Sequence, residues 1–241
     1  MAMTVRVTIL DDHQSIVDGY LYRLKNSPEI EVAATIAFGD EVEPTLAQFP
    51  TDVLLLDVSV PTSPANPNPY PILHMIPKLL QLYPDLDILV ISMHAEHRLI
   101  RAVMDTGASG YILKDDQKTI QDLGNVVRSV ASGGIYFSQK AHQLYNKYQS
   151  RESDELLTNR QLEALSLCAA YPDSTTADLA RKMIVGNSTV RNLLSGAYIR
   201  LDVHNRAAAI AKARQMGLIS PDSPTIPGPA QESISSINSA K

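Results

Sequence analysis

The chain has 241 residues, of which 44% are hydrophobic and 20% are charged, and its formal net charge is −5. This composition is typical of globular proteins with packed cores, and the length suffices for one large or two modest domains. The single cysteine, Cys168, excludes an internal disulfide framework and a cysteine-based metal cluster. No apolar run approaches the roughly 20 residues of a membrane span, and the N-terminus lacks a signal-peptide layout, so we expect a cytoplasmic protein.

Charge is distributed unevenly along the chain. Residues 1–122 hold 8 Lys and Arg against 17 Asp and Glu, whereas residues 158–219 hold 8 Lys and Arg against 4 Asp and Glu. An acidic first part and a basic second part indicate two domains with different partners. The basic excess is a mild indication of nucleic-acid binding, although an excess this small is also compatible with ordinary surface charge.

The first part alternates short apolar runs with longer amphipathic stretches. Strands are predicted at Val5–Leu10, Ile30–Ile36, Val53–Val58, Ile88–Ile91 and Gly110–Leu113. Helices are predicted at Ser15–Lys25, Glu41–Gln48, Ile72–Leu82, His97–Thr106 and Thr119–Ala131. This alternation predicts a five-stranded parallel sheet of the flavodoxin-like, doubly wound kind, with helices on both faces.

Polar residues lie at the carboxyl ends of four of the predicted strands. Asp11 and Asp12 follow the first, Asp57 lies in the last part of the third, Ser92 follows the fourth and Lys114 follows the fifth. In an open parallel sheet, ligands bind beyond the carboxyl ends of the strands. Taken singly, an Asp can cap a helix and a Lys can be a solvated turn residue, but five such residues at one sheet edge favour a functional site.

The chemistry of these side chains points to phosphate and a metal ion. Three neighbouring carboxylates repel one another unless a cation neutralises them, and oxygen ligands suit Mg²⁺. A carboxylate can also attack phosphorus and form an aspartyl phosphate. Lys114 supplies a positive charge and Ser92 a hydroxyl for phosphoryl oxygens.

The segments "ILDDH", "LLLDVSVP", "VISMH" and "GASGYILKDD" resemble the receiver domain of two-component response regulators of the NarL/FixJ kind, over roughly residues 4–132. The resemblance implies that Asp57 accepts a phosphoryl group from a sensor histidine kinase and that Ser92 and Lys114 bind that group. It also implies roles for further residues. Asp12, Asp57 and the backbone carbonyl of Ser59 would hold Mg²⁺, Asp11 would act through the metal's water shell, and Tyr111 would be the aromatic switch residue.

The stretch "TSPANPNPYP" departs from the receiver pattern. Four prolines, at positions 64, 67, 69 and 71, follow Pro61 in a loop that is longer than usual, and Pro77 falls inside the next predicted helix. Proline favours stiff, extended backbone. The loop is either a tolerated surface insertion or a segment that gates access to the site or contacts a kinase.

Residues 133–156 read as a linker that contains a short helix from about Ser138 to Tyr148. Four helices are predicted in residues 157–219, where Thr158 with Gln161 and Thr175 with Asp178 form capping boxes. Two of these helices, joined by a tight turn at Gly186, read as a helix-turn-helix in a small all-α domain. Residues 220–241 are rich in Ser and Pro, and we expect them to be disordered.

The segments "LTNRQLEAL", "DLARKM", "STVRNLL" and "RLDVHNRAAAI" resemble the LuxR-type DNA-binding domain. The resemblance implies that Arg191, Asn192 and Ser195 face the major groove of double-stranded DNA and that Thr189, Lys182 and Arg200 contact phosphates. Leu193 occupies the usual histidine position, and Gly196 interrupts the helix at a cost of roughly 1 kcal/mol relative to Ala. Few basic residues are present, so DNA binding is expected to require a homodimer.

These features predict a transcriptional regulator whose DNA binding is controlled by phosphorylation of Asp57. Its enzymatic activity would be limited to phosphorylating and dephosphorylating itself. Two alternatives remain open: a receiver protein that signals through protein contacts with a degenerate DNA-binding domain, and a phosphohydrolase of the aspartyl-phosphate type. Such hydrolases usually carry a second Asp two residues after the nucleophile, where this chain has Ser59.

Overall fold

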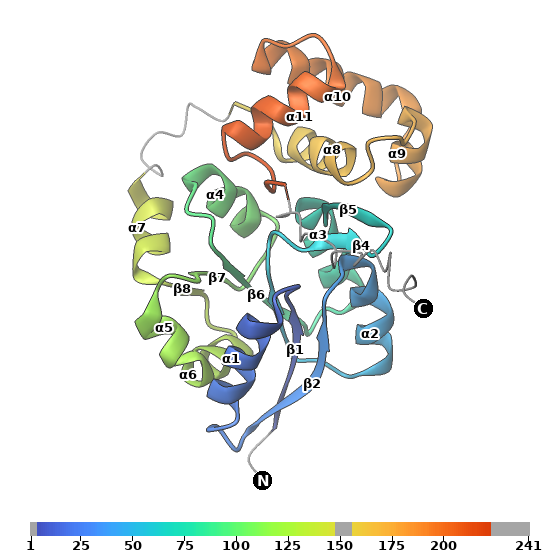
Figure 1. Ribbon diagram of the computed structural model, residues 1–241. Helices are drawn as coiled ribbons and strands as arrows, with labels where there is room; N and C mark the ends of the chain where they lie inside the picture. Colours follow the sequence, from blue (N-terminus) through green and yellow to red (C-terminus); the bar gives the residue numbers. More distant parts are fainter. Residues whose placement is uncertain (1–3, 148–155, 223–241) are drawn as a thin grey trace, which may run out of the picture.

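The computed structural model describes residues 4–147 and 156–222, and it shows an α/β unit (residues 4–147) beneath a helical unit (residues 156–222) (Figure 1). The polar stretch 149–155, expected to be a linker, and most of the Ser- and Pro-rich tail lie outside the described residues. In the part of the chain that is described, no helix is long and apolar enough to cross a membrane.

The α/β unit is built on a parallel sheet in the order β2-β1-β3-β6-β7-β8, six strands within the described residues. Its strands are β1 (Val5–Leu10), β2 (Ile30–Ile36), β3 (Val53–Leu56), β6 (Asp87–Ser92), β7 (Gly110–Leu113) and β8 (Tyr136–Phe137). The parallel, doubly wound fold is confirmed, but the expected number of five strands is wrong. The additional strand, β8, has only two residues, too few for any periodicity to show in the sequence.

Gly110 explains how β8 can join the sheet. A Cβ atom at this position would lie 2.3 Å from the carbonyl oxygen of Tyr136, which is far inside van der Waals contact. The absence of a side chain therefore lets the backbone of residue 136 approach and pair with β7. Residues beyond 132 thus belong to the same packed unit, and α7 (Gln139–Lys147), which carries the buried Ala141, continues it.

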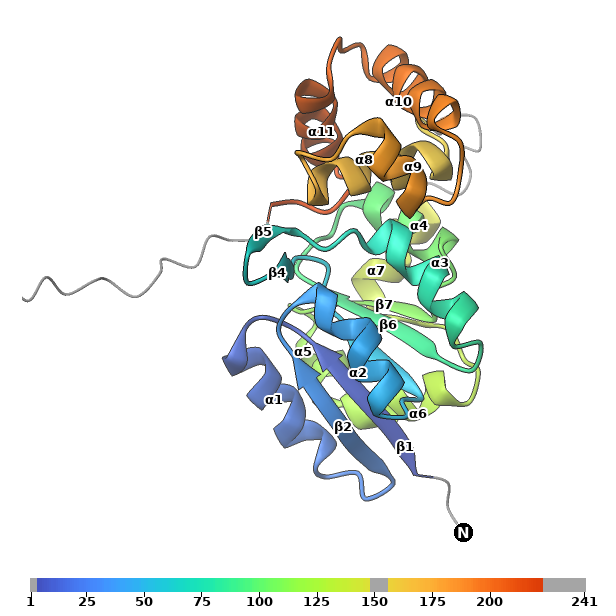
Figure 2. The same cartoon turned by 90° about the vertical axis from the view of Figure 1, so that its right-hand side faces the viewer.

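Helices cover both faces of the sheet (Figures 1 and 2). They are α1 (Gln14–Leu24), α2 (Val42–Gln48), preceded by a short 3-10 turn at Gly39–Glu41, α3 (Ile72–Leu82), α4 (His97–Asp105), α5 (Gln117–Gln121) and α6 (Leu123–Ala131). Side chains of β3 alternate between two cores: Leu54 and Leu56 pack in one, and Val53 and Leu55 in the other. This alternation follows from the two-residue period of a strand and leaves β3 buried along its whole length.

One predicted helix is divided into two in the structure. The single helix predicted over Thr119–Ala131 is divided at Asp122, whose backbone is not helical, and it begins earlier, at Gln117. Asp116 explains the early start, because its carboxylate accepts a hydrogen bond from the backbone N–H of Thr119 and caps α5. The same carboxylate accepts one from the N–H of Gln139, at the beginning of α7.

The Pro-rich stretch forms an antiparallel hairpin of β4 (Pro61–Ser63) and β5 (Asn66–Pro69). It does not stand free in solvent. The side-chain amide of Asn66 donates a hydrogen bond of 2.9 Å to the carbonyl oxygen of Ala170, in the helical unit. The insertion therefore connects the two parts of the chain, a role that its composition did not predict.

The helical unit contains α8 (Asn159–Ala170), α9 (Thr176–Lys182), α10 (Asn187–Leu201) and α11 (Arg206–Gln215). Both capping boxes are confirmed: Thr158 caps α8 together with Gln161, and Thr175 caps α9 together with Asp178. Asn205 caps α11. Cys168 is fully buried in the core of this unit, and burial raises the pKa of its thiol to about 11, as befits a core residue.

The turn between α9 and α10 was predicted on the wrong residue. Gly186 has an ordinary φ of −72° and simply precedes α10. The left-handed residue is Ile184, whose φ is +53° and whose side chain is 91% exposed. This conformation is strained for a β-branched residue, and no sequence rule would assign it to Ile when a Gly stands two positions later.

Candidate functional site

Acidic side chains converge at the carboxyl end of β1 and β3, as the sequence predicted. Oxygen atoms of Asp11, Asp12 and Asp57 and a ring nitrogen of His13 all lie within 4.8 Å of one another. Asp11 and Asp57 are nearly inaccessible, with 3% and 5% of their surface exposed. The structure adds His13 to this group, because its Nδ1 lies 2.9 Å from Oδ1 of Asp12.

Lys114 bridges two of these carboxylates. Its ammonium donates hydrogen bonds of 2.7 Å to Oδ2 of Asp11 and 2.9 Å to Oδ2 of Asp57. Burial raises the pKa of Asp57 above its ordinary value and the charge of Asp11 adds to this, although Lys114 acts in the opposite direction. For Lys114, burial acts to lower the pKa, but the charges of Asp57 and Asp11 outweigh it and raise the pKa.

The donor set suits a hard divalent cation. Three carboxylates lie at this edge and the ammonium of Lys114 contacts two of them, so the cluster keeps an excess of negative charge. Burial is the main cause of the raised pKa of Asp57, because the opposing charge of Lys114 outweighs that of Asp11. Oxygen ligands around a small, partly solvated cluster are those that Mg²⁺ prefers. The residues present therefore fit a metal ion at this position.

Ser92 and Tyr111 are linked through His94. Ser92 ends β6 and is fully buried, and its Oγ accepts a hydrogen bond from the backbone N–H of His94. Tyr111 is also fully buried, and its hydroxyl donates a hydrogen bond of 2.8 Å to the carbonyl oxygen of His94. The hydroxyl groups of Ser92 and Tyr111 thus hold the backbone of the loop that leads from β6 into α4.

Sequence reasoning missed a contact between Ser59 and His94. Nε2 of His94 lies 2.8 Å from Oγ of Ser59, two residues beyond Asp57 in the chain. Nδ1 of the same ring lies 3.7 Å from the carboxylate of Glu96. No pattern of spacing would pair residues 59 and 94, which meet only because β3 and β6 are neighbours in the sheet.

The site reaches the helical unit through Glu96. A Cβ atom at Gly217, after α11, would lie 2.5 Å from Cβ of Glu96, and Gly217 has a φ of +61°. Glycine is therefore required at 217 both for its backbone conformation and for close contact with the beginning of α4. The β6–α4 loop consequently contacts Ser59, two residues after Asp57, through His94, and it contacts the helical unit through Glu96.

The residues expected to contact DNA lie mainly on α10, and all of them are exposed. They are Lys182, Thr189, Arg191, Asn192, Ser195 and Arg200. The opposite face of α10 is buried and carries Val190, Leu194, Ala197 and Leu201. Both views place α10 on the side of the helical unit that is remote from the sheet, so the α/β unit leaves this face open (Figures 1 and 2).

Lys182 differs from the other five residues because it lies at the junction of the two units. Its ammonium is 3.9 Å from the centre of the Tyr171 ring, a cation–π geometry. Together with Asp40 and Glu43 of the α/β unit it lines a cavity of about 220 Å³. In this arrangement, the ammonium that was expected to contact DNA phosphates lines the same cavity as acidic residues of the α/β unit.

The two departures from the LuxR-type pattern have structural explanations. Leu193 is half-buried against the core of the helical unit, so it is a packing residue. Gly196 lies against α8, where an added Cβ would be 2.7 Å from Nε2 of Gln161. The glycine makes room for the side chain that completes the capping box of α8.

A family model for the response regulator receiver domain matches residues 7–127, which hold the acidic cluster, Ser92 and Lys114. The chain therefore belongs to the response regulator family, as the receiver motifs predicted. Two curated relatives are similar over most of its length. The transcriptional regulatory protein DegU of Brevibacillus brevis is 28% identical over 236 residues, covering 89% of this chain and 95% of the relative.

The oxygen regulatory protein NreC of Staphylococcus haemolyticus is 28% identical over 226 residues, covering 89% of this chain and 99% of the relative. Among solved structures, the chain resembles RcsB of Salmonella enterica serovar Typhimurium bound to the promoter rprA in the presence of phosphomimetic beryllofluoride. That match has a TM-score of 0.62 and 20% identity, and it covers 87% of this chain and 98% of RcsB. The similarity extends over both units and shows a shared fold.

Proposed function

We propose that this response regulator is a DNA-binding transcriptional regulator controlled by phosphorylation of Asp57. The observation that carries the proposal is the contact of Lys114 with both Asp11 and Asp57 at the buried end of β3. A nucleophilic carboxylate beside a fixed ammonium is the arrangement that phosphoryl transfer to Asp requires. The names of its relatives support the output, since DegU is a transcriptional regulatory protein and RcsB has been solved on a promoter.

The chemistry would use this chain's own groups in defined roles. An oxygen of the Asp57 carboxylate attacks phosphorus, the bond from phosphorus to the donor nitrogen breaks, and the donor leaves with that electron pair. Lys114 and the hydroxyl of Ser92 then bind the phosphoryl oxygens. Asp12, Asp57 and the carbonyl of Ser59 would hold Mg²⁺, with Asp11 acting through its water shell, and the ion would neutralise charge on the incoming phosphoryl group. Hydrolysis of the acyl phosphate restores Asp57, so the enzymatic activity concerns only the protein itself.

The β6–α4 loop supports a route from this site to the helical unit. His94 contacts Ser59, Ser92 and Tyr111 through different atoms, and Glu96 adjoins Gly217. A change in what Ser92 binds would therefore alter the support of the loop on which the helical unit rests. Tyr111 is the aromatic side chain that would repack with it.

DNA readout would belong to α10. Arg191, Asn192 and Ser195 are exposed on the face opposite its buried stripe, where they would enter the major groove. Thr189, Arg200 and Lys182 would contact phosphates. The partners in this proposal are a sensor histidine kinase in the cytoplasm, double-stranded DNA and a second copy of the chain, because one copy offers few basic groups to DNA.

The phosphorylation step can be tested with phosphoramidate as the donor and Mg²⁺ in the buffer. Intact-protein mass spectrometry should show one added phosphoryl group on the wild type and none on Asp57→Asn. Asp85→Asn removes an exposed carboxylate at the opposite end of the sheet and should be phosphorylated like the wild type. Equal phosphorylation of the Asp57→Asn variant would refute the site.

A further inference from the structure

Tyr20 on α1 carries a buried hydroxyl group without an evident function. The residue is only 4% exposed and packs in the core between the sheet and helices α1 and α6. Among the described residues, its hydroxyl oxygen has no hydrogen-bond partner. Leaving a buried hydroxyl unpaired costs about 1–3 kcal/mol, and such groups are rare in folded proteins. The hydroxyl oxygen is therefore available to accept a hydrogen bond from a donor that moves toward it.

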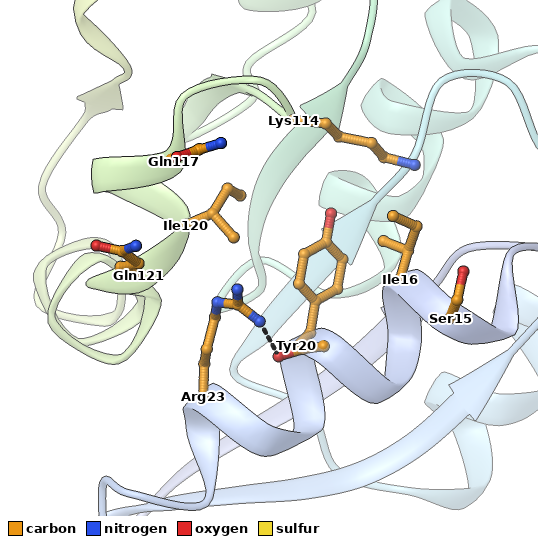
Figure 3. Close-up of a pocket in the computed structure, with 9 residues that line it drawn as sticks. Ser15, Ile16, Tyr20, Arg23, Lys114, Gln117, Ile120 and Gln121 are labelled. Carbon is orange, nitrogen blue, oxygen red and sulfur yellow. Dashed lines mark hydrogen bonds between the residues drawn. The ribbon is translucent and has the colours of Figure 1, made fainter.

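The hydroxyl faces the phosphorylation site. Figure 3 shows the ring of Tyr20 rising from α1 with its oxygen directed toward the side chain of Lys114. Both residues line a cavity of about 310 Å³ between α1 and α5. Burial raises the pKa of Tyr20, and the negative charges of Asp11 and Asp57 raise it further, so the phenol stands within the electric field of the site.

The ammonium of Lys114 has a third N–H that is not used in its hydrogen bonds to Asp11 and Asp57. A lysine ammonium carries three donors, and the two hydrogen bonds described above go to Asp11 and Asp57. Phosphorylation of Asp57 converts its charged carboxylate into an acyl phosphate and moves the negative charge to the phosphoryl oxygens. The ammonium of Lys114 then has to move toward the phosphoryl oxygens, and the cavity beside its side chain leaves room for this movement.

We propose that Tyr20 is a positioning residue for Lys114: its phenol oxygen accepts a hydrogen bond from the third N–H of the ammonium when Lys114 turns from the Asp57 carboxylate to the phosphoryl oxygens. The inference rests on the proposed function, because it takes Asp57 as the phosphoryl acceptor. In the resting protein none of the described residues makes a hydrogen bond to this hydroxyl. During transfer it fixes the direction in which the ammonium points its remaining protons. Phe at this position would keep the ring in the core but offer no acceptor.

The test compares Tyr20→Phe with Tyr22→Phe, which removes a hydroxyl from the same helix at a side chain that is 73% exposed. Phosphorylation of Asp57 by phosphoramidate is followed over a range of donor concentrations. Tyr20→Phe should lower the maximal rate constant about 5- to 10-fold, which corresponds to roughly 1.0–1.4 kcal/mol. The donor concentration at half-maximal rate should not change, and Tyr22→Phe should match the wild type.

A second readout separates positioning from packing. In protein labelled with ¹⁵N-lysine, the ammonium signal of Lys114, assigned with Lys114→Arg, should differ between the wild type and Tyr20→Phe after beryllofluoride is added. Identical rates and identical Lys114 signals in the two proteins would overturn the proposal. So would a slower variant that has a lower unfolding temperature and an unchanged Lys114 signal, since that result indicates a packing role. Failure of the wild type itself to be phosphorylated on Asp57 would instead refute the proposed function.

Discussion

His74 on α3 and Glu163 on α8 form a hydrogen bond across the two parts of the chain, with Nδ1 2.8 Å from Oε1. Both side chains are largely buried, and Arg160 also contacts the Glu163 carboxylate. Burial acts to raise the pKa of Glu163, but the bonds from His74 and Arg160 outweigh it and lower the pKa. This pair, together with Asn66 and Gly217, fixes how the helical unit sits on the α/β unit.

Glu163→Gln should loosen this interface, because a neutral amide loses the charge-assisted part of the bond, about 1.5 kcal/mol. Small-angle X-ray scattering should show a broader distribution of interatomic distances than for the wild type. Asp173→Asn, at an exposed site of the same unit, is the matched control. A Glu163→Gln profile that superimposes on the wild type would show that the pair does not hold the interface.

The lowered pKa of Glu163 also gives a pH dependence. A carboxylate whose pKa is lower in the packed state stabilises that state fully above its ordinary value of 4.5, and this contribution is lost as the pH falls through the lowered value. In the wild type we expect the Glu163 contribution to persist above pH 4.5 and to weaken below it. In Glu163→Gln this acid-dependent part should be missing.

Gly196 and Gln161 should be energetically coupled. Gly196→Ala gains helix propensity of about 1 kcal/mol, but the new methyl group displaces the amide of Gln161, which lies 2.7 Å from the Cβ position and belongs to a capping box. The single substitution should therefore stabilise the protein little or not at all. In a Gln161→Ala background, the same substitution should stabilise by about 1 kcal/mol. Denaturant unfolding of the four proteins measures the coupling, and additive effects would disprove it.

Ile184 occupies a left-handed conformation without burying its side chain. Ile184→Gly should therefore stabilise the protein by about 1 kcal/mol, because it removes strain and loses almost no apolar burial. The midpoint of thermal unfolding should rise by roughly 2–4 °C. A lower midpoint would mean that the side chain makes contacts that its exposure does not reveal.

Asp57→Asn should raise stability in buffer that contains a metal chelator. The pKa of Asp57 is raised in the folded protein, so its ionisation costs stability at neutral pH; the cost is absent below its ordinary value of 3.8 and complete above the raised value. The variant should unfold at a higher temperature than the wild type at pH 7, and the difference should shrink as the pH falls. A variant less stable than the wild type at pH 7 would contradict this electrostatic account.

The sequence predicted the features that depend on local pattern. The bounds of β7 and α3 agree with the runs Gly110–Leu113 and Ile72–Leu82, because periodicity reports which side of an element is buried. The convergence of Asp11, Asp57 and Lys114 followed from the rule that parallel strands share one carboxyl edge. These inferences needed only the order of the elements.

The features that escaped prediction depend on contacts between distant segments. Strand β8 forms because Gly110 admits the backbone of Tyr136, and the Pro-rich hairpin meets Ala170 far along the chain. Lys182 lines a cavity together with acidic residues of the α/β unit. None of these has a signature in the spacing of residues, since each arises from how finished elements pack together.

The central claim is that phosphorylation of Asp57 governs DNA binding, and selection from a random double-stranded DNA pool tests it most directly. The wild type and Asp57→Asn are each incubated with Mg²⁺, with and without beryllofluoride. We predict an enriched motif of two half-sites only for the wild type with beryllofluoride. The same motif at equal enrichment with and without beryllofluoride, or no enriched motif in any sample, would contradict the account.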